Sequence, residues 1–176
     1  LDDTDSLNGG CTTEVLFRLL QDLPDNVSFR TPRLVRLWPF AKRRTRGNAS
    51  VAVELIAEHE EELLTHLDQW WAEHIDSLKG DVGTSDHSDR RQYPTDPGMI
   101  WTSNSASDES FYKSAVSSEI QLQDLPEVTR HWGGNGRIGA TAAVLWPAIR
   151  CTYEAIAWRS HEAEGKRQLS LIHISE

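Results

Sequence analysis

The sequence predicts a mixed fold of helices and strands. Apolar residues recur at helical spacing in two segments, 12–23 and 58–78. Two short segments rich in valine and leucine, 32–39 and 49–56, are bounded by proline or glycine and indicate strands. Because the elements follow in the order helix, strand, strand, helix, and then helix and strand again, an α/β or α+β arrangement is expected.

Composition limits the class of protein. With 176 residues, 38% of them hydrophobic, the chain is long enough for one well-buried domain, or for one domain and part of another. No apolar run reaches the length of a membrane span, and no secretory signal is visible. The two cysteines, Cys11 and Cys151, are too few for a disulfide framework or a four-cysteine zinc site. A cytoplasmic protein without a membrane partner is therefore expected.

Domain boundaries are suggested by a polar stretch over 79–110 that lacks clear periodicity. We interpret it as a connection that ends a first domain, 1–110, and leads into a second segment, 111–160. That segment contains a short helical pattern, a glycine-rich turn, an alanine-rich helix and a strand. Residues 161–176 are expected to form a tail that need not be native, and the acidic motif at residue 2 suggests that the natural chain begins earlier.

The first residues, LDDTDSLNGGCTT, concentrate negative charge. Three carboxylates, Asp2, Asp3 and Asp5, lie within four positions and repel one another unless a cation or a helix terminus offsets them. Gly10 and the start of the first helix follow directly. Carboxylate oxygens suit Mg²⁺ and the N–H groups of a helix N-terminus suit phosphate, so a magnesium–nucleotide site is one interpretation.

Two other interpretations of this motif remain open. The aspartates can simply cap a turn and the start of a helix, as surface aspartates commonly do. The motif also resembles the D-x-D-x-T pattern of haloacid-dehalogenase-like phosphatases, although Leu7 stands where that pattern requires threonine. The adjacent Thr12 and Thr13 are candidate N-caps, and beside a metal-bound nucleotide they are also candidate metal ligands or phosphoryl acceptors. Cys11 is expected only to pack.

Basic residues gather near the front of the chain. Residues 1–56 hold eight Lys/Arg and seven Asp/Glu, a net charge of +1, whereas the remaining residues carry −10, which gives the total of −9. One cluster, KRRTRGN, supplies four cations: Lys42, Arg43, Arg44 and Arg46. Such a run is often a solvated turn. Its ending, formed by Thr45, Arg46, Gly47 and Asn48, favours an anion site because glycine permits close approach and arginine offers a forked donor to phosphate.

The string GNGRIG, residues 134–139, formally satisfies G-x-G-x-x-G. A dinucleotide site requires a strand directly before it. The preceding 125–132 contains proline and is a poor strand candidate, so we reject a dinucleotide site. Gly136, Arg137 and Gly139 are retained as possible contacts to an anion or substrate.

Five blocks in series resemble the tRNA-isoleucine 2-agmatinylcytidine synthetase family: LDDTDSLNGGCTT, PRLVRLWP with TRGN, TDPGMIW, GRIGATAAV and CTYEAIAWR. They extend over residues 1–159. The resemblance implies a kinase-like α/β domain followed by all or part of a ferredoxin-like domain. It also implies an ATP-dependent ligase that uses Mg²⁺ to activate the wobble cytidine of tRNA, after which agmatine displaces the phosphoryl group.

The resemblance carries roles to particular residues. It implies that Asp2, Asp3 and Asp5 are catalytic and hold the metal, and that Thr12 is the autophosphorylated threonine. It implies that ATP is bound by Gly10, Thr13, Thr45, Arg46, Gly47 and Asn48.

Family members continue into a nucleic-acid-binding barrel and a zinc ribbon, and this chain contains neither. It is therefore expected to be a fragment of such an enzyme or a shortened relative. The alternative is a non-catalytic module that binds nucleotide or another anion and regulates a partner. A dependence on magnesium would separate the two.

Overall fold

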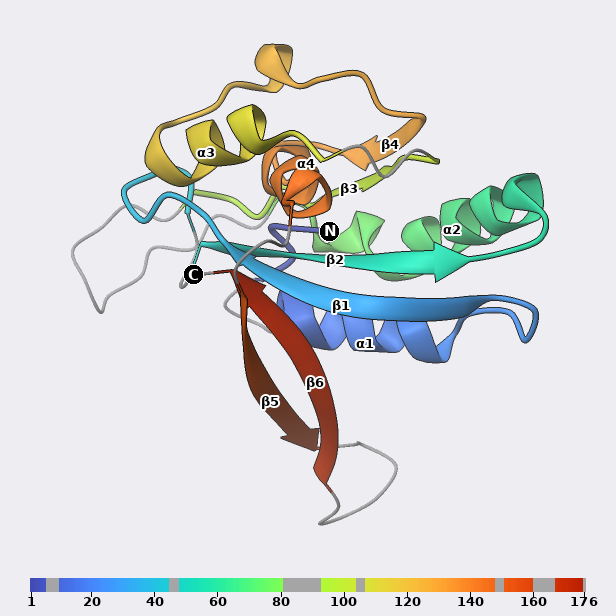
Figure 1. Cartoon of the computed structure of the whole chain (residues 1–176). Helices are drawn as coiled ribbons and strands as arrows, with labels where there is room; N and C mark the ends of the chain where they lie inside the picture. The colour runs from blue at the N-terminus through green and yellow to red at the C-terminus, as the bar shows by residue number, and fades with distance from the viewer. Residues whose placement is uncertain are drawn as a thin grey trace.

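A computed structural model describes residues 1–5, 10–44, 48–80, 93–103 and 107–147, and the backbone of 151–159 and 167–175. It contains helices and strands in mixed order, which confirms the expected fold class (Figure 1). Within the described part of the chain, none of the helices has the length and apolar character to cross a membrane.

The larger sheet has four strands in the order β2-β1-β6-β5. β1 (Ser28–Arg36) pairs antiparallel with β2 (Ala49–Ile56), and β5 (Cys151–Arg159) pairs antiparallel with β6 (Arg167–Ser175). A short parallel contact between β1 and β6 joins the two pairs. The register of β1 shifts between Arg30 and Arg33, which places Pro32 at an irregularity where its missing N–H breaks no regular ladder.

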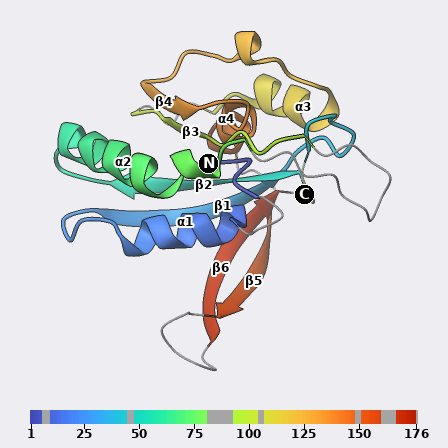
Figure 2. The same cartoon turned by 180° about the vertical axis from the view of Figure 1, so that it is seen from behind.

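Two helices cover part of this sheet and enclose the main core. α1 (Thr12–Gln21) and α2 (Glu60–His74) agree with the periodicity of the sequence, although both end earlier than the pattern does. In Figures 1 and 2, α1 lies on one side of β1 and β2, and α4 (Arg137–Leu145) lies on the other. The N-terminus, α1, α2, β2 and a smaller sheet contribute the thirteen buried residues of the main core: Leu1, Val15, Leu16, Leu19, Val51, Leu63, Leu64, Leu67, Trp70, Trp71, Ile75, Met99 and Trp132.

A second, two-stranded sheet pairs β3 (Gly98–Trp101) with β4 (Arg130–Gly133). β4 overlaps the end of the stretch, 125–132, that the sequence indicates to be a poor strand candidate. That prediction is wrong because four residues suffice to pair with β3, and the proline precedes the strand. α3 (Glu109–Ser117) packs on α4 beside this sheet.

The N-terminal residues connect the two sheets. The amino group of Leu1 donates to the carbonyl oxygen of Val51 at 2.9 Å, and the Val51 N–H donates to the Leu1 carbonyl oxygen at 3.0 Å. One residue later, Asp2 and Gly98 exchange backbone hydrogen bonds of 2.9 and 3.0 Å. The acidic motif is therefore fixed between β2 and β3.

Strands from both sides of the boundary expected near residue 110 pair in the same sheets. β3 and β4 lie on opposite sides of that boundary, as do β1 and β6. The sequence predicts a tail over 161–176, whereas the structure gives Arg167–Ser175 as β6, between β1 and β5.

In a Glu60→Gln variant, the free energy of unfolding is expected to fall less on acidification than it does in the parent. The Glu60 carboxylate accepts hydrogen bonds of 2.7 Å from the indole N–H of Trp101 and the hydroxyl of Ser103, which lower its pKa below 4.5. Because the pKa of Glu60 is lower in the folded chain than in the unfolded chain, its ionised carboxylate stabilises the fold at pH values above the unfolded pKa. This stabilisation disappears as the pH falls through the folded pKa. Thermal unfolding between about pH 6 and pH 3 measures the effect. Parallel pH profiles for parent and variant would contradict it.

Candidate functional site

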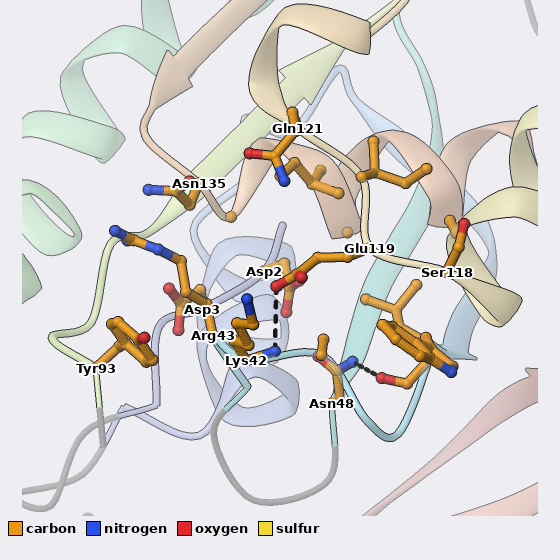
Figure 3. A pocket seen from close by; sticks show the side chains of 18 residues that line it. Asp2, Asp3, Lys42, Arg43, Asn48, Tyr93, Ser118, Glu119, Gln121 and Asn135 are labelled. Carbon is orange, nitrogen blue, oxygen red and sulfur yellow. Dashed lines mark hydrogen bonds between the residues drawn. The ribbon is translucent and has the colours of Figure 1, made fainter. Parts of the chain in front are cut away.

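The acidic motif opens into a pocket of about 300 Å³. Five separate segments form its walls (Figure 3): the N-terminal residues, the loop after β1, the segment before β3 that carries Tyr93, the end of α3 with the segment after it, and the first turn of α4. The lining side chains that carry charge or hydrogen-bonding groups are Asp2, Asp3, Trp38, Lys42, Arg43, Asn48, Tyr93, Ser118, Glu119, Gln121 and Asn135. Pockets of this size accommodate small-molecule ligands.

Asp2 and Asp3 are the acidic part of the pocket, and both are partly buried. Loss of water raises the pKa of Asp2 to about 8, and the neighbouring Asp3 contributes to this rise. Loss of water likewise raises the pKa of Asp3 to about 7, while Arg43 opposes the shift. Asp3 also has a positive φ of 57°, a conformation that residues other than glycine rarely adopt. Both the electrostatic cost and the backbone strain are concentrated at this pair.

Asp96 holds Asp3 in place and was missed by the sequence analysis. Its backbone N–H donates to Asp3 Oδ2 at 3.0 Å. Its own carboxylate accepts from the backbone and side-chain amides of Asn135, at 2.7 and 2.5 Å, and lies 3.4 Å from Lys79 Nζ. Desolvation opposes ionisation of Asp96, but these donors lower its pKa overall. Asp96 thus links the acidic pair to Asn135 on the pocket wall.

Gly136 and Gly139, retained from the sequence as possible ligand contacts, line the pocket. A Cβ added at Gly139 would lie 1.9 Å from Asp2 Oδ2, and one at Gly136 would lie 2.5 Å from the Asp2 carbonyl oxygen. Any side chain at these positions would displace Asp2. The glycines therefore let α4 approach the acidic motif, while Arg137 Nε donates to the Gly134 carbonyl oxygen at 3.2 Å.

Lys42 and Arg43 supply positive charge to the same pocket. The guanidinium of Arg43 lies 5.1 Å from the ring centroid of Tyr93, close enough for a cation–π contact. The backbone N–H of Lys42 donates to Glu119 Oε1 at 3.3 Å, which connects the loop after β1 to the segment after α3 (Figure 3). This hydrogen bond fixes the backbone from which the Lys42 side chain extends.

Asn48 lines the pocket, but its amide nitrogen donates to the Trp38 carbonyl oxygen at 2.5 Å. Its φ of 40° lies in the left-handed region that asparagine tolerates. Asn48 therefore anchors the loop at the pocket. Thr45, Arg46 and Gly47, the other members of the predicted T-R-G-N contact, lie outside the described residues.

Thr12 is the first residue of α1 and is 9% exposed. The Thr4 hydroxyl donates to the Gly10 carbonyl oxygen at 2.7 Å and lies 3.1 Å from the Thr12 hydroxyl. Thr13 Oγ1 lies 3.2 Å from Cys11 Sγ. Gly10, Thr12 and Thr13 are not among the described residues that line the pocket.

Asp5 is likewise not among the described lining residues, and its carbonyl oxygen accepts a hydrogen bond from Thr95 at 3.1 Å. No group of three or more His, Cys, Asp or Glu side chains in the described ranges is arranged to hold a metal ion. The pocket therefore brings together two of the three predicted metal ligands.

GNGRIG does follow a strand, contrary to the expectation from sequence. That strand, β4, pairs antiparallel with β3 in a two-stranded sheet. A dinucleotide-binding fold requires a parallel sheet at this point. The antiparallel pairing of β4, and not the lack of a strand, is therefore the reason that GNGRIG is not a dinucleotide site.

Fold and pocket define an α/β domain in which a carboxylate pair and two cations meet in one ligand-sized cavity. The family model of the TiaS TCKD domain matches residues 1–135, and this chain belongs to that family. The resemblance identified from the five sequence blocks is confirmed.

A curated relative and two solved structures support this family assignment. The isoleucine-tRNA 2-agmatinylcytidine synthetase TiaS of Pyrobaculum neutrophilum is 35% identical over 173 residues, which represent 94% of this chain and 39% of the relative. A crystal structure of TiaS in complex with an isoleucine tRNA and ATP matches with a TM-score of 0.65 and 27% identity, covering 92% of this chain and 38% of the other. A crystal structure of TiaS in complex with the same tRNA, AMPCPP and agmatine matches with a TM-score of 0.60 and 25% identity. This match covers 92% of this chain and 39% of the other. The chain thus spans about two-fifths of the relatives that it matches.

Proposed function

We propose that this chain is the ATP-binding, phosphoryl-transferring part of a cytoplasmic ligase that joins agmatine to a cytidine of tRNA. The observation that carries the proposal is the pocket, where Asp2 and Asp3 share one cavity with Lys42 and Arg43. Support also comes from relatives named for this reaction and from solved TiaS complexes that contain an isoleucine tRNA with ATP, or with AMPCPP and agmatine.

Asp2 and Asp3 are the proposed ligands of Mg²⁺. This ion is usually held by one or two carboxylates together with phosphate oxygens and water, so a pair of carboxylates fits it without a third. The raised pKa values of both groups indicate that a nearby cation is needed to keep both charged at neutral pH. When bound, the ion would stabilise charge on the transferred phosphoryl group. Asp5 stays a prediction as an additional ligand.

Each remaining part of the pocket has a proposed task in binding the nucleotide. Arg43 offers a forked donor to phosphate oxygens, and Lys42 adds a point charge. The N-terminal turn of α4, which lines the cavity at Gly136 and Gly139, favours negative charge through the dipole of the helix. Asp96 and Asn135 act indirectly, by fixing the position of Asp3.

The proposed reaction has two steps. A phosphoryl group of ATP is transferred to the oxygen on the cytidine carbon that is to be substituted, and the nucleotide product leaves. The agmatine amine then bonds through its nitrogen to that carbon and gives up a proton, and phosphate departs with the oxygen. If Thr12 accepts a phosphoryl group, as the family resemblance implies, its hydroxyl must leave the Thr4 hydroxyl, 3.1 Å away.

Incubation of the chain with Mg²⁺ and ATP, with and without agmatine and isoleucine tRNA, tests the proposal. Magnesium-dependent ATP consumption and a phosphothreonine at Thr12, detected by mass spectrometry, are expected. Thr12→Ala should remove the phosphothreonine, whereas Thr65→Ala, at an exposed position on α2, should retain it. ATP binding without consumption or phosphorylation would instead support the regulatory nucleotide-binding module.

A further inference from the structure

The loop after β1 exposes an aromatic ring at the rim of the pocket. Phe40 is 71% exposed, more than the other exposed large hydrophobic side chains described, Phe29 at 46% and Ile56 at 37%. Its neighbours Trp38, Ala41 and Lys42 line the pocket. A single exposed phenylalanine is common on protein surfaces, so what distinguishes Phe40 is how its ring is held and which charges lie beside it.

The ring is held in a fixed position. Phe40 packs edge-to-face on Trp38, with ring centroids 6.1 Å apart and an interplanar angle of 71°. The Trp38 carbonyl oxygen accepts from Ala41 N–H at 3.3 Å and from the Asn48 amide at 2.5 Å. Trp38 N–H in turn donates to the Ala115 carbonyl oxygen at 3.1 Å. Because residues 38–41 are already held by these contacts, a planar ligand that stacks on Phe40 pays little additional ordering entropy.

Positive charge follows the ring directly. Lys42, Arg43 and Arg44 occupy three consecutive positions in a chain whose net charge is −9. Arg44 Nη1 donates to the Ala41 carbonyl oxygen at 2.8 Å, which keeps its guanidinium beside the turn that carries Phe40. A rigid aromatic ring next to clustered cations is the combination that binds single-stranded nucleic acid, since bases stack on the ring and phosphates contact the cations.

We infer that Phe40 stacks on a nucleobase of single-stranded RNA, with Arg44 contacting the adjoining phosphate, while the neighbouring nucleotide enters the pocket. This rests on the proposed function, because it takes the pocket to accept an RNA substrate. Charge favours RNA over a protein partner here, since the cations beside Phe40 attract a polyanion. Phe40 is thereby a positioning residue for the substrate strand.

Fluorescence anisotropy with a short fluorescein-labelled single-stranded RNA tests the stacking contact. Phe40→Ala is expected to weaken binding about tenfold, and Phe40→Trp to retain it, because loss of one base–aromatic stack has an effect of this order. Phe29→Ala removes an exposed phenylalanine at the opposite end of β1 and should leave the affinity unchanged. Parental affinity of Phe40→Ala, or of Phe40→Leu, would overturn the inference, as would the absence of RNA binding by the parent.

Salt dependence separates the two kinds of contact. Arg44→Gln should reduce the slope of log affinity against log salt concentration by about 0.7, whereas Phe40→Ala should leave the slope unchanged. An unaltered slope for Arg44→Gln would contradict the phosphate contact. ATP binding is measured on the same proteins. If the parent does not bind ATP but its RNA affinity depends on Phe40, the proposed function is wrong and the stacking contact stands. If the parent binds ATP and substitution of Phe40 does not change its RNA affinity, the proposed function stands and the stacking contact is wrong.

Discussion

Asp3→Asn is expected to lower magnesium-dependent ATP consumption about 10²- to 10³-fold, the range found when a preorganised electrostatic contact to a transition state is removed. Asparagine keeps the size of the side chain and can still accept the hydrogen bond that the Asp96 N–H donates to Asp3 Oδ2 at 3.0 Å. It lacks the negative charge needed to hold a cation against phosphate. Steady-state measurement of ADP or phosphate release at several ATP concentrations would place the loss mainly in kcat.

The same variant separates catalysis from folding. Loss of water raises the pKa of Asp3 to about 7, so above that pH the folded chain carries a charge that the unfolded chain holds at lower cost. Removing the charge should leave the melting temperature equal or higher at about pH 8, while the rate falls. Asp25→Asn, at an exposed loop position after α1, is the matched control and should retain parental rate. Parental turnover by Asp3→Asn would refute the role given to this carboxylate.

Elements with strong local patterns were predictable from the sequence. The apolar residues of α1 and α2 recur at helical spacing because one face of each helix enters the core, so both helices were identified. β2 has the bounds expected from its valine-rich run between loop residues. β1 begins at Ser28, four residues before the expected segment. Its first three residues are exposed and include one large apolar residue, Phe29, so they show no alternating pattern that would have predicted this start.

β4 and the pairing of β6 were not predictable, for different reasons. β4 has only four residues, Arg130–Gly133, and is stabilised by partners far away in sequence. The Trp132 indole N–H, for example, donates to Asp68 on α2 at 2.7 Å. β6 gains its place by pairing with β1 and β5, a relation that no local pattern of residues 167–175 encodes.

The pocket was predictable in part. The acidic motif and the basic loop were found as candidates because charge clustering is visible along the sequence, and Asp2, Asp3, Lys42 and Arg43 do share one cavity. Asp96 gave a weaker signal, since a single carboxylate before a proline is typical of a turn. Its role emerges only when β3 is placed beside the N-terminal residues, through the bridge between Asp2 and Gly98.

Gly139→Ala is expected to destabilise the fold by about 1–3 kcal/mol, the usual cost of overpacking. In an isolated helix this substitution would stabilise by about 1 kcal/mol, because alanine is the better helix former. At Gly139 the added Cβ would lie 1.9 Å from Asp2 Oδ2 and 2.8 Å from Leu37 Cδ1. Leu37 can rotate away, whereas the Asp2 carboxylate would lose the hydrogen bond that it accepts from the backbone of Asp3 if it moved. The Asp2 backbone cannot shift to relieve the clash because two hydrogen bonds join it to Gly98. Chemical denaturation of parent and variant measures the change.

A double-mutant cycle identifies the group responsible for this cost. In an Asp2→Ala background the carboxylate is gone, so Gly139→Ala should become neutral or stabilising as helix propensity takes over. The sign of the Gly139→Ala effect therefore depends on one carboxylate that the proposed reaction also requires. Equal destabilisation in both backgrounds would mean that α4 meets some other obstacle. A reversal of sign would establish that glycine is kept in this helix to make room for Asp2, although it lowers helix stability.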